Sequence, residues 1–209
     1  MLWVTTQSVD QQIDHAPQPE NAQGLHVCGV DLTSAQEAKA ALDKVIELAG
    51  APSVIVNIAG GFAWETLDDG GAETWEKMFR RNTLTAVNMC KAALPVLADQ
   101  SGAAIINIGA AAASKADAGM GAYAASKAGV ARLTESLAAE LSDKDVTVNA
   151  VLPTIIDTPT NRADMPDADF GEWVRAEDIA EVIAYLASSS ARAVTGASIP
   201  VSRGTGKFD

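Results

Sequence analysis

The sequence is poor in the residues that form disulfides and zinc sites. Its 209 residues include 2 cysteines and 2 histidines. Cys28 and Cys90 lie in the apolar runs LHVCGV and AVNMCKAAL, so we interpret both as small buried hydrophobic residues. His15 and His26 stand alone and fit no metal-ligand spacing. The sequence therefore predicts neither a disulfide nor a metal site.

Long apolar runs are also missing. A membrane-spanning helix needs about 18 or more consecutive apolar residues, and the sequence has no such stretch. The N-terminus, MLWVTTQSVDQQ, has neither the positive region nor the apolar core of a signal peptide. We therefore expect a cytoplasmic protein with no membrane partner.

Basic residues are scarce relative to acidic ones. The chain has 15 Lys and Arg against 27 Asp and Glu, a formal net charge of −12. A protein this acidic repels nucleic-acid backbones and anionic membrane surfaces, so we expect neither as a partner. Any phosphate that it binds must be held by backbone N–H groups or by a local Arg or Lys. This leaves a small-molecule substrate as the expected ligand.

What is present is an ordinary globular composition, with 48% hydrophobic and 20% charged residues. We predict one domain over residues 1–209. Short apolar runs alternate with segments of helical period. Strands are predicted at residues 25–30, 53–58, 103–108, 147–152 and 197–202, and helices at residues 34–49, 72–98, 122–142 and 176–188. This alternation indicates an α/β fold with a doubly wound, mostly parallel sheet.

Several element boundaries can also be read from the sequence. The first helix should be capped near Thr33 or Ser34 and end at Gly50. Pro95 should bend or break the last turn of the second helix. Residues 154–174 are acidic, read as irregular, and are long for a connection, so we expect a substrate lid there.

Small residues follow three of the predicted strands. They are Ala59-Gly60-Gly61, Gly109-Ala110 and Pro153-Thr154. The carboxyl ends of parallel strands meet at one edge of a sheet, where ligands bind in such folds. We therefore expect the functional site at this edge.

Tyr123 and Lys127 lie four residues apart on the predicted helix 122–142. Residues at this spacing share one helix face, so the phenol and the ammonium point the same way. A neighbouring ammonium favours the phenolate and is expected to lower the pKa of the tyrosine from about 10. The pair therefore predicts a tuned general acid.

The segment AAIINIGAAAASKADAGMGAYAASKAGVARL, followed by TVNAVLPTIIDTP, resembles the short-chain dehydrogenase/reductase family. The resemblance extends over residues 25–202. It implies a Rossmann-like fold and an NAD(P)H-dependent oxidoreductase. Tyr123 would donate a proton, and Lys127 would lower its pKa and hold the nicotinamide ribose. Asn82, in MFRRNTLTAV, falls where the family has a catalytic asparagine that holds a water chain to the lysine; the alternative is a polar residue that kinks the helix.

The same resemblance implies a set of cofactor contacts. Asn57-Ile58-Ala59-Gly60 resembles the family's Asn-Asn-Ala-Gly turn, and the turn at Pro153 would lie near the nicotinamide, with Thr158 on its amide. Asp14 would bind the adenosine ribose and so favour NADH, with NADPH possible, or it is a loop carboxylate. Asp31 would touch the adenine or simply begin the next helix.

Within the family, the sequence resembles the dihydropteridine reductases. The shared stretches are VNIAGGF at 56–62, GMGAY at 119–123 and VLPTIIDTPTNRADMPDADFGEW at 151–173. This implies reduction of a quinonoid dihydropterin or a similar flat heterocycle. Most of the family has a serine 13 residues before the tyrosine, where this chain has Ala110. Alanine offers no oxyanion donor, so simple ketones are expected to be poor substrates.

The resemblance also suggests which residues surround the substrate. Phe62 and Trp64 follow the double-glycine turn and would stack on its ring, or they serve ordinary packing. Asn161 and Met165 would reach it from the lid. The family pairs through helices that correspond to 72–98 and 122–142, so we expect a homo-oligomer, either a dimer or a tetramer.

The family's opening strand, glycine-rich turn and helix have no counterpart in residues 1–24, so we expect an N-terminally incomplete fold. Three explanations stay open. The reading frame is truncated, the segment LWVTT rebuilds the strand, or the protein has lost cofactor binding. The last would make it a catalytically silent scaffold, which is our alternative to an enzyme.

Overall fold

The computed structural model describes residues 27–202. Its helices are α1 (Ala35–Ala49), α2 (Ala72–Met78), η1 (Phe79–Leu84), α3 (Thr85–Leu97), η2 (Ala111–Ala113), α4 (Gly121–Glu140), α5 (Pro159–Asp164), η3 (Phe170–Glu172), α6 (Ala176–Leu186) and η4 (Ser189–Ala191). Its strands are β1 (Val54–Asn57), β2 (Ala103–Ile108), β3 (Val146–Pro153), β4 (Ile156–Asp157), β5 (Val174–Arg175) and β6 (Ser198–Val201). Within these residues no helix is long and apolar enough to cross a membrane.

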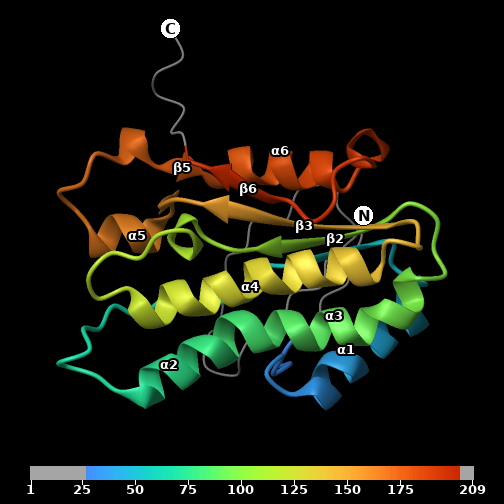
Figure 1. Cartoon of the computed structure of the whole chain (residues 1–209), viewed down its shortest axis with the longest axis horizontal. Helices are drawn as coiled ribbons and strands as arrows, with labels where there is room; N and C mark the ends of the chain where they lie inside the picture. The colour runs from blue at the N-terminus through green and yellow to red at the C-terminus, as the bar shows by residue number, and fades with distance from the viewer. Residues whose placement is uncertain (1–26, 203–209) are drawn as a thin grey trace, which may run out of the picture.

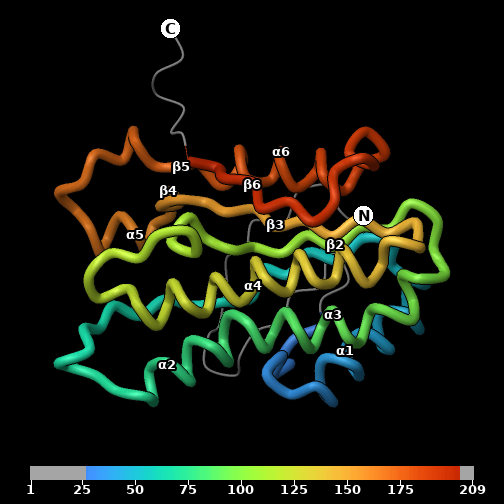
Figure 2. Tube along the Cα trace, viewed as in Figure 1, coloured from blue at the N-terminus to red at the C-terminus, as the bar shows by residue number. Residues whose placement is uncertain are grey.

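The main sheet is parallel, with strand order β1-β2-β3-β6. Figure 1 shows all its visible arrows pointing to the end of the molecule where α5 lies. Helices α1, α3 and α4 lie on one side of the sheet and α6 on the other (Figures 1 and 2). The doubly wound α/β architecture predicted from the sequence is confirmed.

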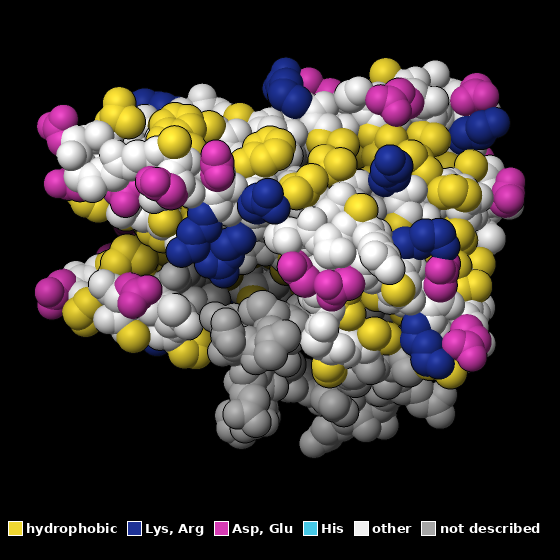
Figure 3. Space-filling view, turned by 90° about the horizontal axis from the view of Figure 1, so that it is seen from below, with side chains coloured by type: hydrophobic (Ala, Val, Ile, Leu, Met, Phe, Trp, Pro, Cys, Tyr) yellow, Lys and Arg dark blue, Asp and Glu magenta, His cyan; other side chains and the backbone are white. Residues whose placement is uncertain are grey.

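Each face of the sheet has its own core. The core under the α1, α3 and α4 side includes Leu97, Ile105 and Val148, all fully buried. The core under α6 includes Ile106 and Val151. Consecutive strand residues thus serve opposite faces, which is why these strands are apolar throughout. On the face seen from below, a group of Lys and Arg side chains lies near the middle, with Asp and Glu side chains on both sides of it (Figure 3).

The predicted strand at 25–30 is wrong for its described part, residues 27–30, which form no strand. Gly29 adopts a left-handed φ of 73°, which interrupts an extended run. The N–H of Thr33 then donates to the Asp31 carboxylate at 2.8 Å, and Ser34 caps α1. The apolar run therefore belongs to the loop that leads into α1, and apolar composition alone did not distinguish this loop from a strand.

The region 154–174 was predicted to be irregular, and this is also wrong. Strands β4 and β5 pair as a second small parallel sheet. Thr158 caps α5, because its hydroxyl accepts from the N–H of Asn161 at 3.2 Å, and Pro159 occupies the first helical position.

The helix predicted at 72–98 is confirmed over residues 72–97, where η1 is a π-helical turn between α2 and α3. Pro95 does not break it, since α3 continues to Leu97. The predicted end of α1 at Gly50 is confirmed, since Gly50 has a φ of 86° and its N–H donates to the carbonyl of Ile46.

Candidate functional site

The predicted small-residue turns lie together at the carboxyl edge of the main sheet. Gly60 and Gly61 follow β1, Gly109 follows β2, and β3 ends at Pro153. The N–H of Gly109 donates to the Val151 carbonyl at 2.8 Å, which joins the ends of β2 and β3. A Cβ at Gly109 would lie 2.3 Å from a Leu152 side-chain carbon, so only glycine allows this approach.

Lys127 is buried beside these turns. It extends from α4, is 5% exposed, and its Nζ donates to the Ile108 carbonyl at 2.8 Å. Burial lowers its pKa from 10.5 to about 8. A Cβ at Gly60 would lie only 3.3 Å from this Nζ, so the turn after β1 passes directly over the ammonium.

Tyr123 lies one helical turn before Lys127 and is partly buried. Burial raises the pKa of its phenol above 10. The predicted lowering of this pKa by the neighbouring lysine is therefore wrong, because the desolvation of the phenol outweighs any such effect. The phenol is therefore protonated at neutral pH.

Asn82 connects the turn after β1 to α4. It lies in the π-helical turn, a feature that often marks functional sites. Its Oδ1 accepts from the N–H of Gly61 at 2.8 Å, while its Nδ2 donates to the Gly61 carbonyl at 3.0 Å and to Ser126 Oγ at 2.9 Å. Ser126 Oγ donates in turn to the Tyr123 carbonyl at 2.7 Å. The side chain is thus used as a clamp; a role in a water chain stays a prediction.

Asn57 points into the fold. Its Nδ2 donates to Asn107 Oδ1 at 2.8 Å, and Asn107 Nδ2 donates to Thr134 Oγ1 at 2.9 Å. A longer contact of 3.3 Å joins Asn57 to the sulfur of Cys90. Burial raises the pKa of the Cys90 thiol to about 12, so it stays protonated and inert. The side chain of Asn57 is therefore engaged within the protein, and a cofactor contact from this residue stays a prediction.

Aromatic side chains border Tyr123. The Phe62 ring meets the Tyr123 ring edge-on, with centroids 5.0 Å apart and planes at 79°. Trp64 is exposed, and its Nε1 donates to the Ala118 carbonyl at 3.0 Å. Gly119 has a φ of 76°, and a Cβ there would lie 2.2 Å from the indole. Of the two predicted substrate residues, Phe62 thus lies beside the predicted general acid, and Trp64 packs on the segment that precedes α4.

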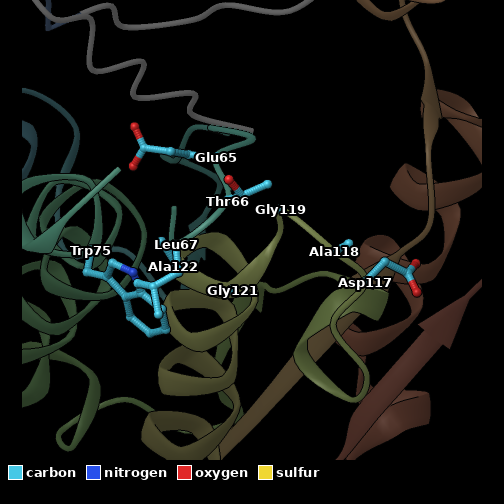
Figure 4. Close-up of a pocket in the computed structure, with 9 residues that line it drawn as sticks. All are labelled: Glu65, Thr66, Leu67, Trp75, Asp117, Ala118, Gly119, Gly121 and Ala122. Carbon is cyan, nitrogen blue, oxygen red and sulfur yellow. The ribbon is translucent and has the colours of Figure 1, made fainter. Parts of the chain in front are cut away.

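A pocket of about 300 Å³ lies next to the contact between Trp64 and Gly119. Its lining residues, drawn in Figure 4, come from the segment after Trp64, from α2, from the loop before α4 and from the start of α4: Glu65, Thr66, Leu67, Trp75, Asp117, Ala118, Gly119, Gly121 and Ala122. The carboxylates of Glu65 and Asp117 point away from each other (Figure 4). They therefore make no common cation site.

Side chains within the lid region 154–174 bond and pack against one another. Arg162 makes two bonds to the Asp157 carboxylate, at 2.6 and 2.7 Å, and its guanidinium lies 4.7 Å from the centroid of the Phe170 ring. The Nδ2 of Asn161 donates to the Ile156 carbonyl at 2.7 Å, so this amide holds the lid itself. Met165 is partly exposed at the end of α5.

The remaining predicted residues divide into three cases. Ala110 is buried directly after β2, and Ser114 is exposed beyond η2. Asp31 accepts from Thr33 and begins the approach to α1, which agrees with its simpler interpretation. Asp14 lies outside the described residues, as do the expectations about residues 1–24.

Sequence reasoning missed Ser126, Gly119 and Arg81. The position of Gly119 just before the helix of Tyr123 could have indicated a role near the site. Its contact with Trp64 could not be predicted, because Trp64 is distant in the chain. Ser126 adjoins Lys127, and nothing local indicated that it bonds Asn82. Arg81 adjoins Asn82 and packs on Gly61, which only the folded chain shows.

Comparison with known proteins places this site in a family. A family model described as enoyl-(acyl carrier protein) reductase matches residues 2–206. A 3-oxoacyl-(acyl-carrier-protein) reductase from Pseudomonas aeruginosa is 34% identical over 194 residues, covering 88% of this chain and 78% of that protein. The protein of the same name from Thermotoga maritima is 29% identical over 184 residues, covering 84% and 74%.

Solved structures agree. A short-chain oxidoreductase from Pseudomonas aeruginosa PAO1, described as NADPH-bound with an atypical catalytic center, has a TM-score of 0.80 at 25% identity, covering 90% of this chain and 77% of that one. Thermoplasma acidophilum aldohexose dehydrogenase, in ligand-free form, has a TM-score of 0.79 at 27% identity, covering 90% and 80%.

These similarities support the wider family and not the narrower resemblance to dihydropteridine reductases, and they do not favour a silent scaffold. They extend over the Tyr123–Lys127 helix and over the turns that meet it. The chain is an NAD(P)H-dependent oxidoreductase that belongs to the short-chain dehydrogenase/reductase family.

Proposed function

We propose that the chain reduces a flat, conjugated heterocycle of the quinonoid dihydropterin kind with a nicotinamide cofactor. The observation that carries this proposal is Ala110, which is buried after β2 and presents a methyl group. Reduction of a ketone builds negative charge on one oxygen, which needs a hydrogen-bond donor in the transition state. A quinonoid ring spreads that charge over several atoms, so a donor at residue 110 is dispensable.

The residues present fit the cofactor. Lys127 uses one of its three ammonium donors on Ile108, and among residues 27–202 no further acceptor bonds it. The other two donors suit the hydroxyls of a ribose. Gly60 keeps the approach to this ammonium open, because a Cβ there would lie 3.3 Å from Lys127 Nζ. When bound, the nicotinamide supplies a hydride.

The chain's own residues supply the proton and the orientation. Tyr123 is protonated at neutral pH, as a proton donor must be, and stands on the first turn of α4. The exposed rings of Phe62 and Trp64 offer flat apolar surface to a heterocycle. We assign Met165 and Asn161 of the lid to the opposite side of that ring, and Pro153 and Thr158 to the nicotinamide.

A second candidate is reduction of a 3-oxoacyl thioester, favoured by the name of the 34% identical relative. Initial rates of NADH and NADPH oxidation by the full chain, with a quinonoid dihydropterin and with acetoacetyl thioesters, separate the two. We expect the dihydropterin to be reduced at least about tenfold faster. A faster thioester reaction would overturn the assignment, and so would a chain that binds cofactor but reduces neither substrate.

The cofactor preference is a further part of the proposal. A carboxylate at Asp14 on the adenosine ribose would repel a 2′-phosphate, so NADH should bind more tightly than NADPH. Calorimetric titration of the full chain with each cofactor tests this. Equal or tighter binding of NADPH would contradict the assigned role of Asp14.

We also propose a homo-oligomer that forms through α2, α3 and α4. Trp75 on α2 and Phe79 at the start of η1 have 45% and 50% of their surface exposed. Large exposed aromatic residues are costly unless a partner covers them. Sedimentation should show a dimer or tetramer for the wild type, and Phe79→Glu should shift it to smaller species. A monomeric wild type would contradict the proposal.

A further inference from the structure

Arg81 packs its guanidinium against Gly61. A Cβ at Gly61 would lie 2.6 Å from Arg81 Cζ and 2.8 Å from both Nε and Nη2. Gly61 has no left-handed φ, so its backbone conformation does not require glycine. The close approach of the guanidinium requires it instead.

This guanidinium has no anionic partner in the described part of the chain. Residues 27–202 contain six arginines, and four of them lie within 4.0 Å of a carboxylate: Arg132, Arg162, Arg175 and Arg192. Arg81 is not among them, and in the same range its side chain donates no hydrogen bond. Arg80 is likewise unpaired within these residues, so the feature that distinguishes Arg81 is its close contact with Gly61.

A second cation lies beside the same turn. Lys127 Nζ would be 3.3 Å from a Cβ at Gly60, while Arg81 adjoins the next residue, Gly61. Both glycines follow β1 at the carboxyl edge of the sheet, where ligands bind in such folds. A cation beside each of two consecutive residues favours the binding of an anion at this turn. Of the two, the guanidinium has the planar fork that matches a phosphate.

We propose that Arg81 binds a phosphate group of the dinucleotide cofactor. The inference rests on the proposed function, because that function brings the dinucleotide to Lys127. The phosphate has two possible sources, the pyrophosphate that NADH and NADPH share and the 2′-phosphate that only NADPH carries. In either case Arg81 adds positive charge to that of Lys127 beside the turn after β1.

Calorimetric titration of the full chain with NADH and with NADPH tests the proposal. Arg81→Gln should weaken binding by about ten- to hundredfold, the range expected for a lost hydrogen bond to a charged group. Arg81→Lys, which keeps the charge but not the fork, should fall between. Arg80→Gln is the matched control, since it removes the same charge one residue away, and it should leave the Kd within about twofold.

The two cofactors distinguish the two sources. Weaker binding of both assigns the pyrophosphate, and weaker binding of NADPH alone assigns the 2′-phosphate. If the wild type binds the cofactors and Arg81→Gln binds NADH and NADPH with the same Kd values, this inference is overturned and the proposed function is not. A folded wild type that binds neither cofactor overturns the proposed function, and the inference with it.

Gly61→Ala tests the geometry without changing any charge. Its methyl group would displace the guanidinium, which is the flexible end of a side chain, so the fold should survive. We expect weaker cofactor binding with an unchanged melting temperature. Raising the salt concentration should weaken wild-type binding more than Arg81→Gln binding, because the variant has one cation fewer to screen. Equal salt dependence, or wild-type affinity in Gly61→Ala, would contradict the proposal.

Discussion

Asn82 and Gly61 are joined by two hydrogen bonds in opposite directions, one from the Gly61 N–H at 2.8 Å and one to the Gly61 carbonyl at 3.0 Å. Like the paired backbone bonds between two strands, these bonds join a π-helical turn to the loop after β1. They leave the glycine little freedom to rotate. Since Gly60 and Gly61 each adjoin one cation, this pair also fixes where those cations stand relative to the backbone.

Asn82→Asp should disable the site and destabilise the fold. The carboxylate keeps one acceptor but loses both donors and adds a buried charge, so we expect the free energy of unfolding to fall by about 3 kcal/mol. The turnover number should also fall at least about tenfold, because the turn is no longer held. Urea unfolding and steady-state kinetics measure the two effects.

Asn88→Asp is the control for this change. Asn88 is a buried asparagine on α3 whose Nδ2 donates to the Leu32 carbonyl at 2.9 Å. The same substitution there should cost stability and spare turnover in the molecules that remain folded. Equal loss of turnover in both variants would mean that Asn82 acts only through stability.

Tyr123→Phe should abolish proton donation without unfolding the protein. General acid catalysis typically contributes about 10²- to 10⁴-fold, so the turnover number should fall by at least about a hundredfold. The chain's other tyrosine, Tyr185, is exposed on α6, and Tyr185→Phe should behave as wild type. Comparable turnover in the two variants would exclude Tyr123 as the acid.

The activity should fall as the pH rises through about 8. Burial lowers the pKa of Lys127 to about 8, so its ammonium loses its proton there instead of near 10.5. Bound cofactor that hydrogen-bonds the ammonium would move this limb upward. The pH profile of kcat/KM, which reports the free enzyme, is the measurement. A profile that is level to pH 10 would contradict the lowered pKa.

The same shift predicts how stability changes with pH. Between about pH 8 and 10.5 the unfolded chain keeps a proton on Lys127 that the native chain has lost. Native stability should therefore rise over this window relative to Lys127→Met, by at most about 1.4 kcal/mol per pH unit. Below pH 8 both states are protonated, so the difference between wild type and variant should be constant. A constant difference up to pH 10.5 would show that the lysine titrates normally.

Ala110→Ser should widen the substrate range. A hydroxyl after β2 would supply the donor that a developing alkoxide needs, so the kcat/KM for a ketone or a 3-oxoacyl thioester should rise at least about tenfold. Reduction of a quinonoid dihydropterin should change little. Ala113→Ser, in the adjoining short helix, is the control. No gain for carbonyl substrates would mean that Ala110 is not what limits them.

Gly119→Ala should destabilise more than Gly29→Ala. Both glycines have a left-handed φ, 76° and 73°, but nothing lies within 4 Å of a Cβ at Gly29, whereas Trp64 lies 2.2 Å from one at Gly119. The first cost is backbone strain of about 1 kcal/mol, and the second adds about 1–3 kcal/mol of steric overlap. Urea unfolding gives both values, and equal values would mean that Trp64 moves freely.

The sequence was informative where local chemistry decides the structure. The boundaries of α1 follow from the Ser34 cap and Gly50, and the apolar period of β2 predicts residues 103–108 without error. The four-residue spacing of Tyr123 and Lys127 places them on one helix face regardless of the surroundings. The family followed from these same segments.

Other features depend on partners that are distant in the chain. The lid is ordered by Arg162 lying between Asp157 and Phe170, although Thr158-Pro159 already carried the local signal for α5. The pKa of Tyr123 depends on burial, which no spacing reveals. The contact of Arg81 with Gly61 likewise exists only once the turn after β1 has reached the helix.

The series of hydrogen bonds from the Asn57 amide through the Asn107 amide to the Thr134 hydroxyl has a consequence for strand register. Strands β1 and β2 are runs of Val, Ile and Ala whose faces would tolerate a slip of two residues almost equally well. Asn57 and Asn107 are direct neighbours across the two strands, and a slip would break the hydrogen bond between their amides, at a cost of about 1–3 kcal/mol. This polar pair within an apolar sheet thus fixes the register of β1 against β2, and with it the relative positions of Gly60 and Gly109 at the ends of the two strands.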